Sequence, residues 1–515
     1  MTRNKRVNQG FLRILATLAC LSIACTATVP TVGPDTSLSS TISPSPLPTE
    51  AQATPIPAPS PATPTRLLGS VHPPLSTEAA GSPGPLAVVK GRIQLFGAQD
   101  AGAATITVTR IAERVTAETV AEGLEVPWAL AFTPDGRMLV TERPGRIRVI
   151  QNGQLLEQPM AVLDVASVSE AGLMGIAVDP NFADNSHLYV CYTYRTDSGG
   201  LLNRIARLTD SGGRAGDLQV ILDNIPAARN HNGCRLRFGP DDKLYVTMGD
   251  AQSADNAQSL ESLSGKILRL ERDGSVPADN PFPGSFVYSY GHRNPQGLDW
   301  HPETGDLFIT EHGPSQDDEI NILVAGGNYG WPQVTGASSN GAYLDPILAF
   351  TPTIALAGAA FYTGESLAAS WDGDFIFANL KGSHLRRIGL KPPEFRSVSS
   401  QQILFLEEFG RLRAVTLGPD GYIYFSTSNR DGRGRPFPGD DKILRLIPED
   451  SEPPLLVQAA AQGNFSLELE SGTYRLGIAA PGYSSYQRRL VVEVGQQIDL
   501  GLVQLTARAG GSNRP

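Results

Sequence analysis

The 515-residue chain has few cysteines, little helical patterning and no excess of positive charge. Only four cysteines are present, and two of them fall within the first 25 residues, so at most one disulfide is available to the rest. Apolar spacing at the helical period is scarce beyond the N-terminus, which argues against a mainly helical fold. The formal net charge of −10 argues against nucleic acid or an anionic membrane surface as the main partner.

Turn-forming residues and short alternating runs are abundant instead. The chain contains 53 glycines and 40 prolines, and 41% of its residues are hydrophobic, which is ample for a core. Its length exceeds that of one ordinary domain. Many short alternating segments between glycine and proline turns predict an all-β protein.

Residues 1–25 are typical of a targeting segment. A basic start precedes the apolar run 14–24, which is too short to span a membrane. The run ends at Cys25 in a sequence that is similar to a bacterial lipobox, whose cysteine becomes lipidated. The alternative is an ordinary secretory signal. We therefore expect an exported protein, either lipid-anchored at the outer face of the bacterial membrane or secreted.

Residues 26–85 are rich in Pro, Ser, Thr and Ala and nearly free of aromatic residues. Such a composition cannot bury enough surface to fold, so we expect an extended tether. In the folded part only Cys191 and Cys234 remain. They either form a disulfide in an oxidising compartment or are two small buried side chains.

A repeated pattern occupies residues 113–450. An apolar strand, a Pro-Asp-Gly-like turn and a second apolar strand occur six times, with several copies adding a later strand. Six such repeats predict a six-bladed β-propeller, with a strand near 116–120 completing the last blade. The copies begin at Trp128, Leu173, Cys234, Gly297, Ala359 and Arg411.

The flanks 86–112 and 451–508 contain further alternating strands, and 509–515 is a short tail. Joined, the flanks resemble one carboxypeptidase-regulatory-like β-sandwich, in glycine positions and in the segments Gly-Thr-Tyr (472–474) and Ala-Pro-Gly-Tyr (480–483). This resemblance implies that the propeller is inserted in a loop of the sandwich. Two unrelated strand-rich flanks are the alternative.

Three motifs follow one another between 291 and 332: GHRNPQGL, EHGPSQDDEIN and GGNYGWP. In this order they resemble the pyrroloquinoline quinone (PQQ) dependent soluble glucose and aldose sugar dehydrogenases, a family with a six-bladed propeller. The resemblance covers roughly 121–448. It implies oxidation of an aldose at its anomeric carbon to a lactone, with PQQ and Ca²⁺ as cofactors and an external electron acceptor.

The resemblance also implies the catalytic residues. His231 matches the base that takes the proton of the anomeric hydroxyl, and Asp250, one hairpin later, matches the group that holds its other ring nitrogen. Arg293 matches the residue that stabilises negative charge on the quinone.

Cofactor ligands are implied in the same way. Three residues of the first motif would contact the quinone, and three cations on other blades would hold its carboxylates. Arg411 and Arg413 share one side of a strand, where two like charges are costly unless an anion lies between them. The implied cofactor ligands are Arg293, Asn294, Gln296, Lys381, Arg411 and Arg413.

Gly313 and Pro314 match the main-chain carbonyls that hold Ca²⁺, and oxygen ligands suit this hard cation. For 317–319 we expect a solvated acidic turn. The chain departs from the family pattern at two positions. It has Glu170 where the family often has glutamine, and Thr351 where the glucose-oxidising members have an aromatic residue that packs on the quinone. Glu170 is nevertheless a candidate ligand of sugar hydroxyls.

Two other functions remain open: a Ca²⁺-dependent lactonase-type hydrolase and a non-catalytic carbohydrate- or wall-binding propeller. The first would need a central ring of carboxylates and amides, whereas this chain supplies the cations Lys381, Arg411 and Arg413. The set His231, Asp250 and Arg293 argues against the second. The sugar, the acceptor and the oligomeric state do not follow from the sequence.

Overall fold

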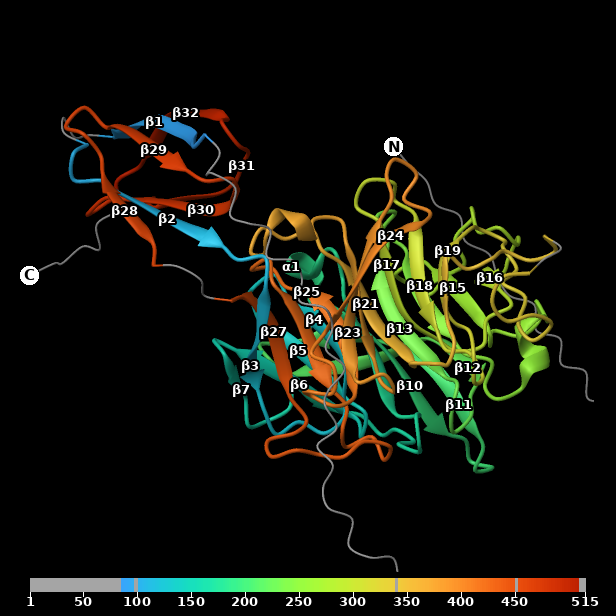
Figure 1. The fold of residues 1–515 in the computed structure, drawn as a ribbon. Coiled ribbons are helices and arrows are strands. Elements are labelled where there is room, and N and C mark those ends of the chain that lie inside the picture. The colour runs from blue at the N-terminus through green and yellow to red at the C-terminus, as the bar shows by residue number, and fades with distance from the viewer. Residues whose placement is uncertain (1–84, 97–100, 339–340, 450–452, 509–515) are drawn as a thin grey trace, which may run out of the picture. The chain divides into compact units, whose positions relative to one another are not determined.

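The computed structural model describes residues 85–96, 101–338, 341–449 and 453–508. The predictions for the targeting segment, Cys25 and the tether lie outside the described residues. In the described ranges the chain is almost entirely β-structure (Figure 1). Its helices are α1 (Phe182–Asn185) and the 3₁₀ segments η1 (Ala254–Ala257) and η2 (Ala369–Trp371). None of these helices is both long and apolar enough to cross a membrane.

The six repeats form six antiparallel sheets, one per blade. The first blade contains β4 (Pro127–Phe132), β5 (Met138–Glu142), β6 (Arg146–Gln151), β7 (Gln154–Leu155) and β8 (Ala161–Val162). The second contains β9 (Leu173–Val178), β10 (His187–Arg195), β11 (Leu201–Asp210) and β12 (Ala215–Pro226). The third contains β13 (Gly233–Phe238), β14 (Leu244–Met248), β15 (Lys266–Leu270) and β16 (Val287–Tyr290). The fourth blade contains β17 (Pro295–Trp300), β18 (Leu307–Glu311), β19 (Asp318–Leu323) and β20 (Leu348–Phe350). The fifth contains β21 (Leu356–Phe361), β22 (Phe375–Asn379), β23 (His384–Leu390) and β24 (Val398–Leu404). The sixth contains β25 (Leu412–Leu417), β26 (Ile423–Thr427), β27 (Ile443–Pro448) and β3 (Val115–Ala121).

The ring closes through the last blade. Strand β3, which precedes all the other propeller strands, pairs antiparallel with β27, with Ala117 opposite Leu446. The inner strand β25 then lies against β4, the inner strand of the first blade. This confirms the six-bladed propeller and its closing strand, and it joins the first and last blades of the ring directly.

Buried hydroxyl groups connect neighbouring blades near the start of several inner strands. The register between inner and second strands is interrupted there by a bulge, as between Pro127 and Ala129. Second-strand hydroxyls donate to carbonyls of the next blade: Thr141 to Met174 at 2.6 Å, and Thr310 to Ala357 at 2.6 Å. These bonds satisfy backbone oxygens that would otherwise be buried without a partner.

The flanks form a two-layer sandwich with its own apolar core. Strands from before and after the propeller pair directly, and Figure 1 shows the blue strands among the red ones. Val89 lies opposite Leu467, and Ile106 lies opposite Ile478. The sheets are β29–β1–β32 and β28–β2–β30–β31, with β1 (Ala87–Leu95), β2 (Thr105–Ile111), β28 (Leu455–Gln458), β29 (Asn464–Leu469), β30 (Gly472–Ala479), β31 (Tyr486–Val492) and β32 (Gln497–Leu505).

Cys191 on β10 and Cys234 on β13 form a disulfide between the second and third blades. Both residues are fully buried. Of the two alternatives left open by the sequence, the structure therefore shows the bridge.

Replacing Cys191 and Cys234 by alanine should destabilise the fold. A bridge between residues 43 positions apart restricts the unfolded chain, and its loss should cost about 2–4 kcal/mol. The measurement is the denaturant midpoint of the double variant against the wild type under oxidising conditions. A reductant should lower the wild-type midpoint and leave the variant unchanged; equal midpoints without reductant would contradict the prediction.

Candidate active site

A cavity of about 200 Å³ lies where the inner strands of the propeller begin. In an antiparallel blade, the start of the inner strand and the end of the second strand meet at the same end. Loops from all six blades therefore contribute to this cavity. Its lining residues are Trp128, Glu170, Met174, Asn232, Gly233, Gln296, His312, Ala355, Leu380, Lys381, Arg411, Arg413 and Arg433.

His231 and Asp250 form the pair that the sequence predicts. The His231 Nδ1 lies 2.8 Å from the Asp250 Oδ1. The other carboxylate oxygen accepts a hydrogen bond from Trp331 Nε1 at 2.8 Å, and Asp250 is 1% exposed. An acceptor at Nδ1 places the imidazole proton there. The Nε2 lone pair is then free to accept a proton, since it has no hydrogen-bond partner in the described part of the chain.

The backbone around this pair is strained. Ser169, His231, Cys234, Ala251 and Gln252 all have left-handed backbone angles, with φ of 56°, 61°, 71°, 55° and 58°. Each such residue costs on the order of 1–3 kcal/mol, and such residues persist only where their surroundings fix them. Their concentration around the His–Asp pair is typical of a functional site.

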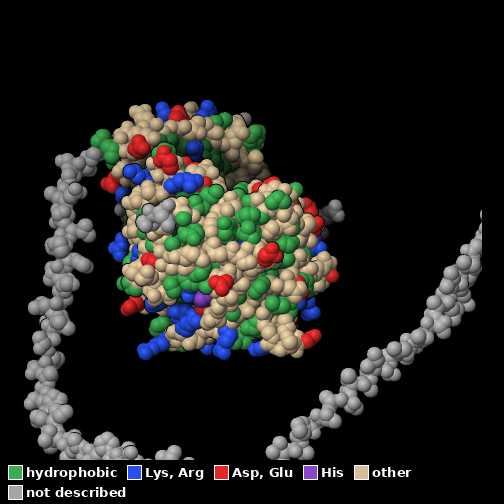
Figure 2. Space-filling view, turned by 90° about the vertical axis from the view of Figure 1, so that its right-hand side faces the viewer, with side chains coloured by type: hydrophobic (Ala, Val, Ile, Leu, Met, Phe, Trp, Pro, Cys, Tyr) green, Lys and Arg blue, Asp and Glu red, His purple; other side chains and the backbone are tan. Residues whose placement is uncertain are grey.

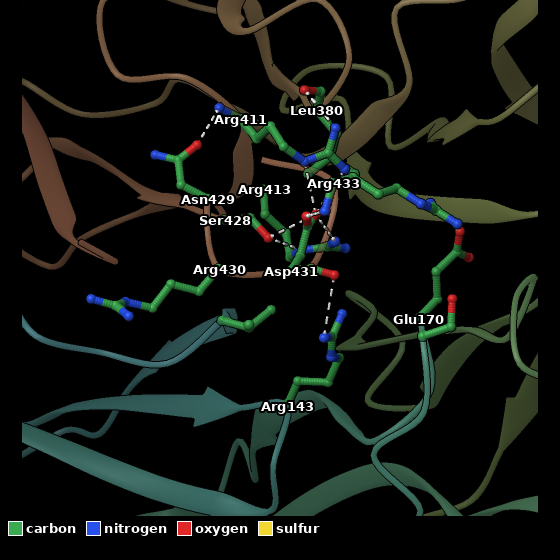
Figure 3. Close-up of polar contacts among 12 residues, drawn as sticks. Arg143, Glu170, Leu380, Arg411, Arg413, Ser428, Asn429, Arg430, Asp431 and Arg433 are labelled. Carbon is green, nitrogen blue, oxygen red and sulfur yellow. Dashed lines mark hydrogen bonds and ion pairs between the residues drawn. The ribbon is translucent and has the colours of Figure 1, made fainter. Parts of the chain in front are cut away.

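Arg411 and Arg413 converge on a carboxylate of the chain, Asp431 (Figure 3). The Asp431 Oδ2 lies 2.7 Å from Arg411 Nη2 and 3.5 Å from Arg413 Nη2. Burial alone would raise the pKa of Asp431, but the two guanidinium groups outweigh it and lower the pKa. The expectation that an anion lies between the two arginines therefore holds, and the anion present is a carboxylate of the chain itself, Asp431.

The cavity nevertheless has an excess of cations. Lys381 and Arg433 line it together with the two arginines, and Glu170 is the acidic side chain of this lining. Arg143 lies beside Asp431 (Figure 3). Lys381 Nζ donates to the Thr353 hydroxyl at 3.0 Å rather than to a carboxylate. Figure 2 shows that Lys and Arg side chains gather beside a histidine on one part of the surface, although the chain as a whole is acidic.

The Arg293-Asn294-Pro295-Gln296 turn carries several polar atoms without a partner; Gln296 lines the cavity, whereas Arg293 lines a small neighbouring pocket with Gly313 and Pro314. Arg293 Nε, Asn294 Nδ2 and Gln296 Oε1 are buried and have no hydrogen-bond partner in the described ranges. His312 Nε2 is also buried and without a hydrogen-bond partner in the described ranges. Buried polar atoms of this kind are costly unless a ligand or water satisfies them, so the set fits a flat, polar ligand.

Of the two main-chain carbonyls expected to hold Ca²⁺, those of Gly313 and Pro314, the first already accepts a hydrogen bond. Arg293 Nη1 donates to the Gly313 carbonyl at 2.9 Å, which leaves one lone pair of that oxygen for another partner. Pro314 is exposed. In the described ranges no group of three or more His, Cys, Asp and Glu side chains is arranged to hold a metal ion.

The expected solvated acidic turn at 317–319 is wrong. Asp318 is fully buried, and its carboxylate accepts the N–H groups of Gly313, Ile354 and Ala355 at 2.6–2.8 Å. These donors fix the loop before β21 to the loop after β18. Thr351 donates to Asp317 at 2.7 Å and supplies no ring to the cavity.

Several residues of the site carry no local sequence signal. Trp128 forms one wall and has Arg235 over its ring at 4.1 Å and Arg413 at 5.9 Å. Arg433 and Asp431 belong to one loop whose Asp-Gly-Arg-Gly sequence resembles an ordinary turn. Only their contacts identify them: Asp431 pairs with the two arginines at the start of its own blade's inner strand, and Arg433 pairs with Glu170.

A sequence model of the glucose/sorbosone dehydrogenase family matches residues 124–445. The chain belongs to this family. A protein of Thermus thermophilus, provisionally assigned as an oxidoreductase (glucose dehydrogenase), has a structure similar to 65% of this chain and 100% of its own, with 46% identity and a TM-score of 0.60.

Other members resemble the chain over the same region. The PQQ-bound aldose sugar dehydrogenase of Streptomyces coelicolor is 35% identical, with a TM-score of 0.58, over 65% of this chain and 99% of its own. Aldose sugar dehydrogenase YliI of Escherichia coli is 32% identical over 342 residues, 62% of this chain and 91% of the relative. The match to the family model ends before the C-terminal part of the sandwich.

Glu319 is a buried carboxyl that lies near Gly313 and Pro314. Burial, followed by the charge of Glu311 opposite it in the sheet, raises the pKa of Glu319 to about 8. The protonated carboxyl is therefore the form that favours folding. The stability that it contributes is complete below the unfolded-state pKa and is lost as pH rises through about 8.

Glu319→Gln should remove this loss. We expect the melting temperatures of variant and wild type to be similar near pH 5, and the variant to become the more stable as pH rises toward 8, measured with EDTA present. Glu303→Gln, at an exposed loop, is the matched control. A difference that is constant across this pH range would contradict the assignment.

Proposed function

We propose that the chain is a PQQ- and Ca²⁺-dependent dehydrogenase that oxidises aldose sugars at the anomeric carbon to lactones and passes the electrons to an external acceptor. The observation that carries this proposal is the pairing of a histidine base with a cation-rich cavity. The His231 Nε2 is free to accept a proton within the described part of the chain, and the two residues that follow it, Asn232 and Gly233, line the cavity. The similarity to a PQQ-bound aldose sugar dehydrogenase and to aldose sugar dehydrogenase YliI supports the assignment.

The residues of the cavity fit a planar tricarboxylate. Lys381, Arg411 and Arg413 would hold its carboxylates, and the unpaired atoms of Asn294 and Gln296 would satisfy its ring substituents. When bound, PQQ supplies the two-electron acceptor for the hydride of the sugar. Ca²⁺ would use the carbonyls of 313 and 314, which are suitable hard oxygen ligands.

The chain's own contribution to catalysis is proton transfer and orientation. His231 would take the hydroxyl proton of the sugar at Nε2. Asp250 would stabilise the resulting imidazolium at 2.8 Å from Nδ1, and Trp331 holds the carboxylate in place. Export and lipidation at Cys25 complete the proposal, because an external acceptor requires an extracytoplasmic enzyme.

The test is reconstitution of purified apoprotein with PQQ and Ca²⁺, followed by dye reduction with a panel of aldoses. His231→Ala should lower turnover by roughly 10²–10⁴-fold, since acid–base catalysis is worth that much. PQQ binding, followed by absorbance, should be retained. Absence of dye reduction by the wild type with every aldose would reject the function, and unchanged turnover in the variant would remove His231 from the mechanism.

Arg411→Ala should show the opposite behaviour. Charge-assisted hydrogen bonds contribute about 1.5–3 kcal/mol each, so PQQ binding should weaken roughly ten- to a hundredfold. Turnover at saturating PQQ should change less. Arg396→Ala, which removes an exposed arginine paired with Asp306, is the control for a change of net charge. Reconstitution of Arg411→Ala at the wild-type PQQ concentration would exclude a role in cofactor binding.

A further inference from the structure

The two oxygens of the Glu170 carboxylate have different partners. Oε2 accepts the main-chain N–H of His231 at 3.1 Å. Oε1 accepts a hydrogen bond from Arg433 Nη1 at 2.6 Å. Burial alone would raise the pKa of Glu170, but His312 and Arg433 outweigh it and lower the pKa, so the carboxylate is ionised. Glu170 thus links the base to a loop of another blade.

Arg433 is presented by the loop after β26. Its own N–H donates to Asp431 Oδ1 at 2.9 Å, which fixes the turn from which the side chain extends. Figure 3 shows the side chain reaching from this turn to Glu170. Its second guanidinium nitrogen lies 3.3 Å from Asn230 Oδ1, so Arg433 contacts both Glu170 and the residue that precedes His231.

The His231 backbone needs such support because its φ of 61° is left-handed for a non-glycine residue. Its carbonyl accepts the Ala251 N–H at 3.1 Å, and the neighbouring Asn230 N–H donates to Gln252 at 3.2 Å. A side chain at Gly249 would approach the His231 carbonyl to 2.2 Å, so only glycine fits there. Glu170 supports the His231 N–H from outside this hairpin.

We propose that Glu170 and Arg433 form a positioning bridge that holds the His231 backbone so that its imidazole faces both Asp250 and the substrate. The proposal rests on the proposed function for its kinetic consequence. It assigns Glu170 a role through the base, because the hydrogen bonds of its two oxygens join the His231 N–H to Arg433.

The variants Glu170→Ala, Glu170→Gln and Arg433→Gln separate these roles. Loss of the acceptor in Glu170→Ala should lower kcat on the order of 10- to 100-fold, the cost of a misplaced catalytic group, with KM for the sugar nearly unchanged. Glu170→Gln keeps an acceptor for the His231 N–H and should restore most of kcat. Arg433→Gln should lower kcat less than Glu170→Ala, and combining the two should add little, since they act through one contact.

A raised KM with unchanged kcat in both Glu170 variants would overturn the proposal and make Glu170 a sugar ligand. A second measurement does not depend on activity. Hydrogen exchange of the apoprotein peptide that contains His231 should quicken in Glu170→Ala and remain slow in Glu170→Gln. Equal exchange in wild type and Glu170→Ala would also overturn the proposal. If the reconstituted wild type proves inactive, the proposed function fails while the exchange result still decides the bridge.

Discussion

Closure of the ring by β3 is the constraint on which the site depends. The strand from the N-terminal side pairs with β27, and this pairing brings the last blade against the first. Glu170, just before the inner strand of the second blade, and Arg433, in the last blade, are 263 positions apart and meet at the centre of the closed ring. The bulges near the start of the inner strands then turn the adjoining loops toward the centre, where the blades together line the cavity.

Closure of the ring also brings buried arginine side chains together at the cavity, and their positive charge favours an anionic ligand there. Burial lowers the pKa of Arg413 to about 10, despite the opposing effect of Asp431, and burial lowers that of Arg235 to about 9, with Arg413 adding to the effect. A lowered arginine pKa means that the protein environment disfavours the cation. An anionic ligand would relieve this cost, since burying a charge is tolerable only when it is paired. Asp431 pairs part of the charge and leaves the remainder for a ligand.

The fold was predictable because its signals are local and repeated. Each blade carries its own strand–turn–strand pattern, and the closing strand near 116–120 was expected. The pairing of His231 with Asp250 could also be predicted from the sequence, since one hairpin separates them. What failed was long-range pairing. Asp318 looked solvated because its partners Ile354 and Ala355 belong to the next blade. Asp431 was missed because it lies 20 positions after Arg411, in a loop that resembles an ordinary turn.

The departures from the family pattern are understandable from the same contacts. A carboxylate at Glu170, where the family often has an amide, would by itself place a negative charge beside the base. The guanidinium of Arg433 lies 2.6 Å away and cancels that charge while leaving the second oxygen for the His231 N–H. Thr351 is a different case, because its hydroxyl binds Asp317 and the residue itself brings no ring to the site. Flat surfaces instead come from Trp128, under two guanidinium groups, and from Trp331, which also holds Asp250. Arg433 thus balances the charge of Glu170, and Trp128 and Trp331 supply aromatic surface where Thr351 supplies none.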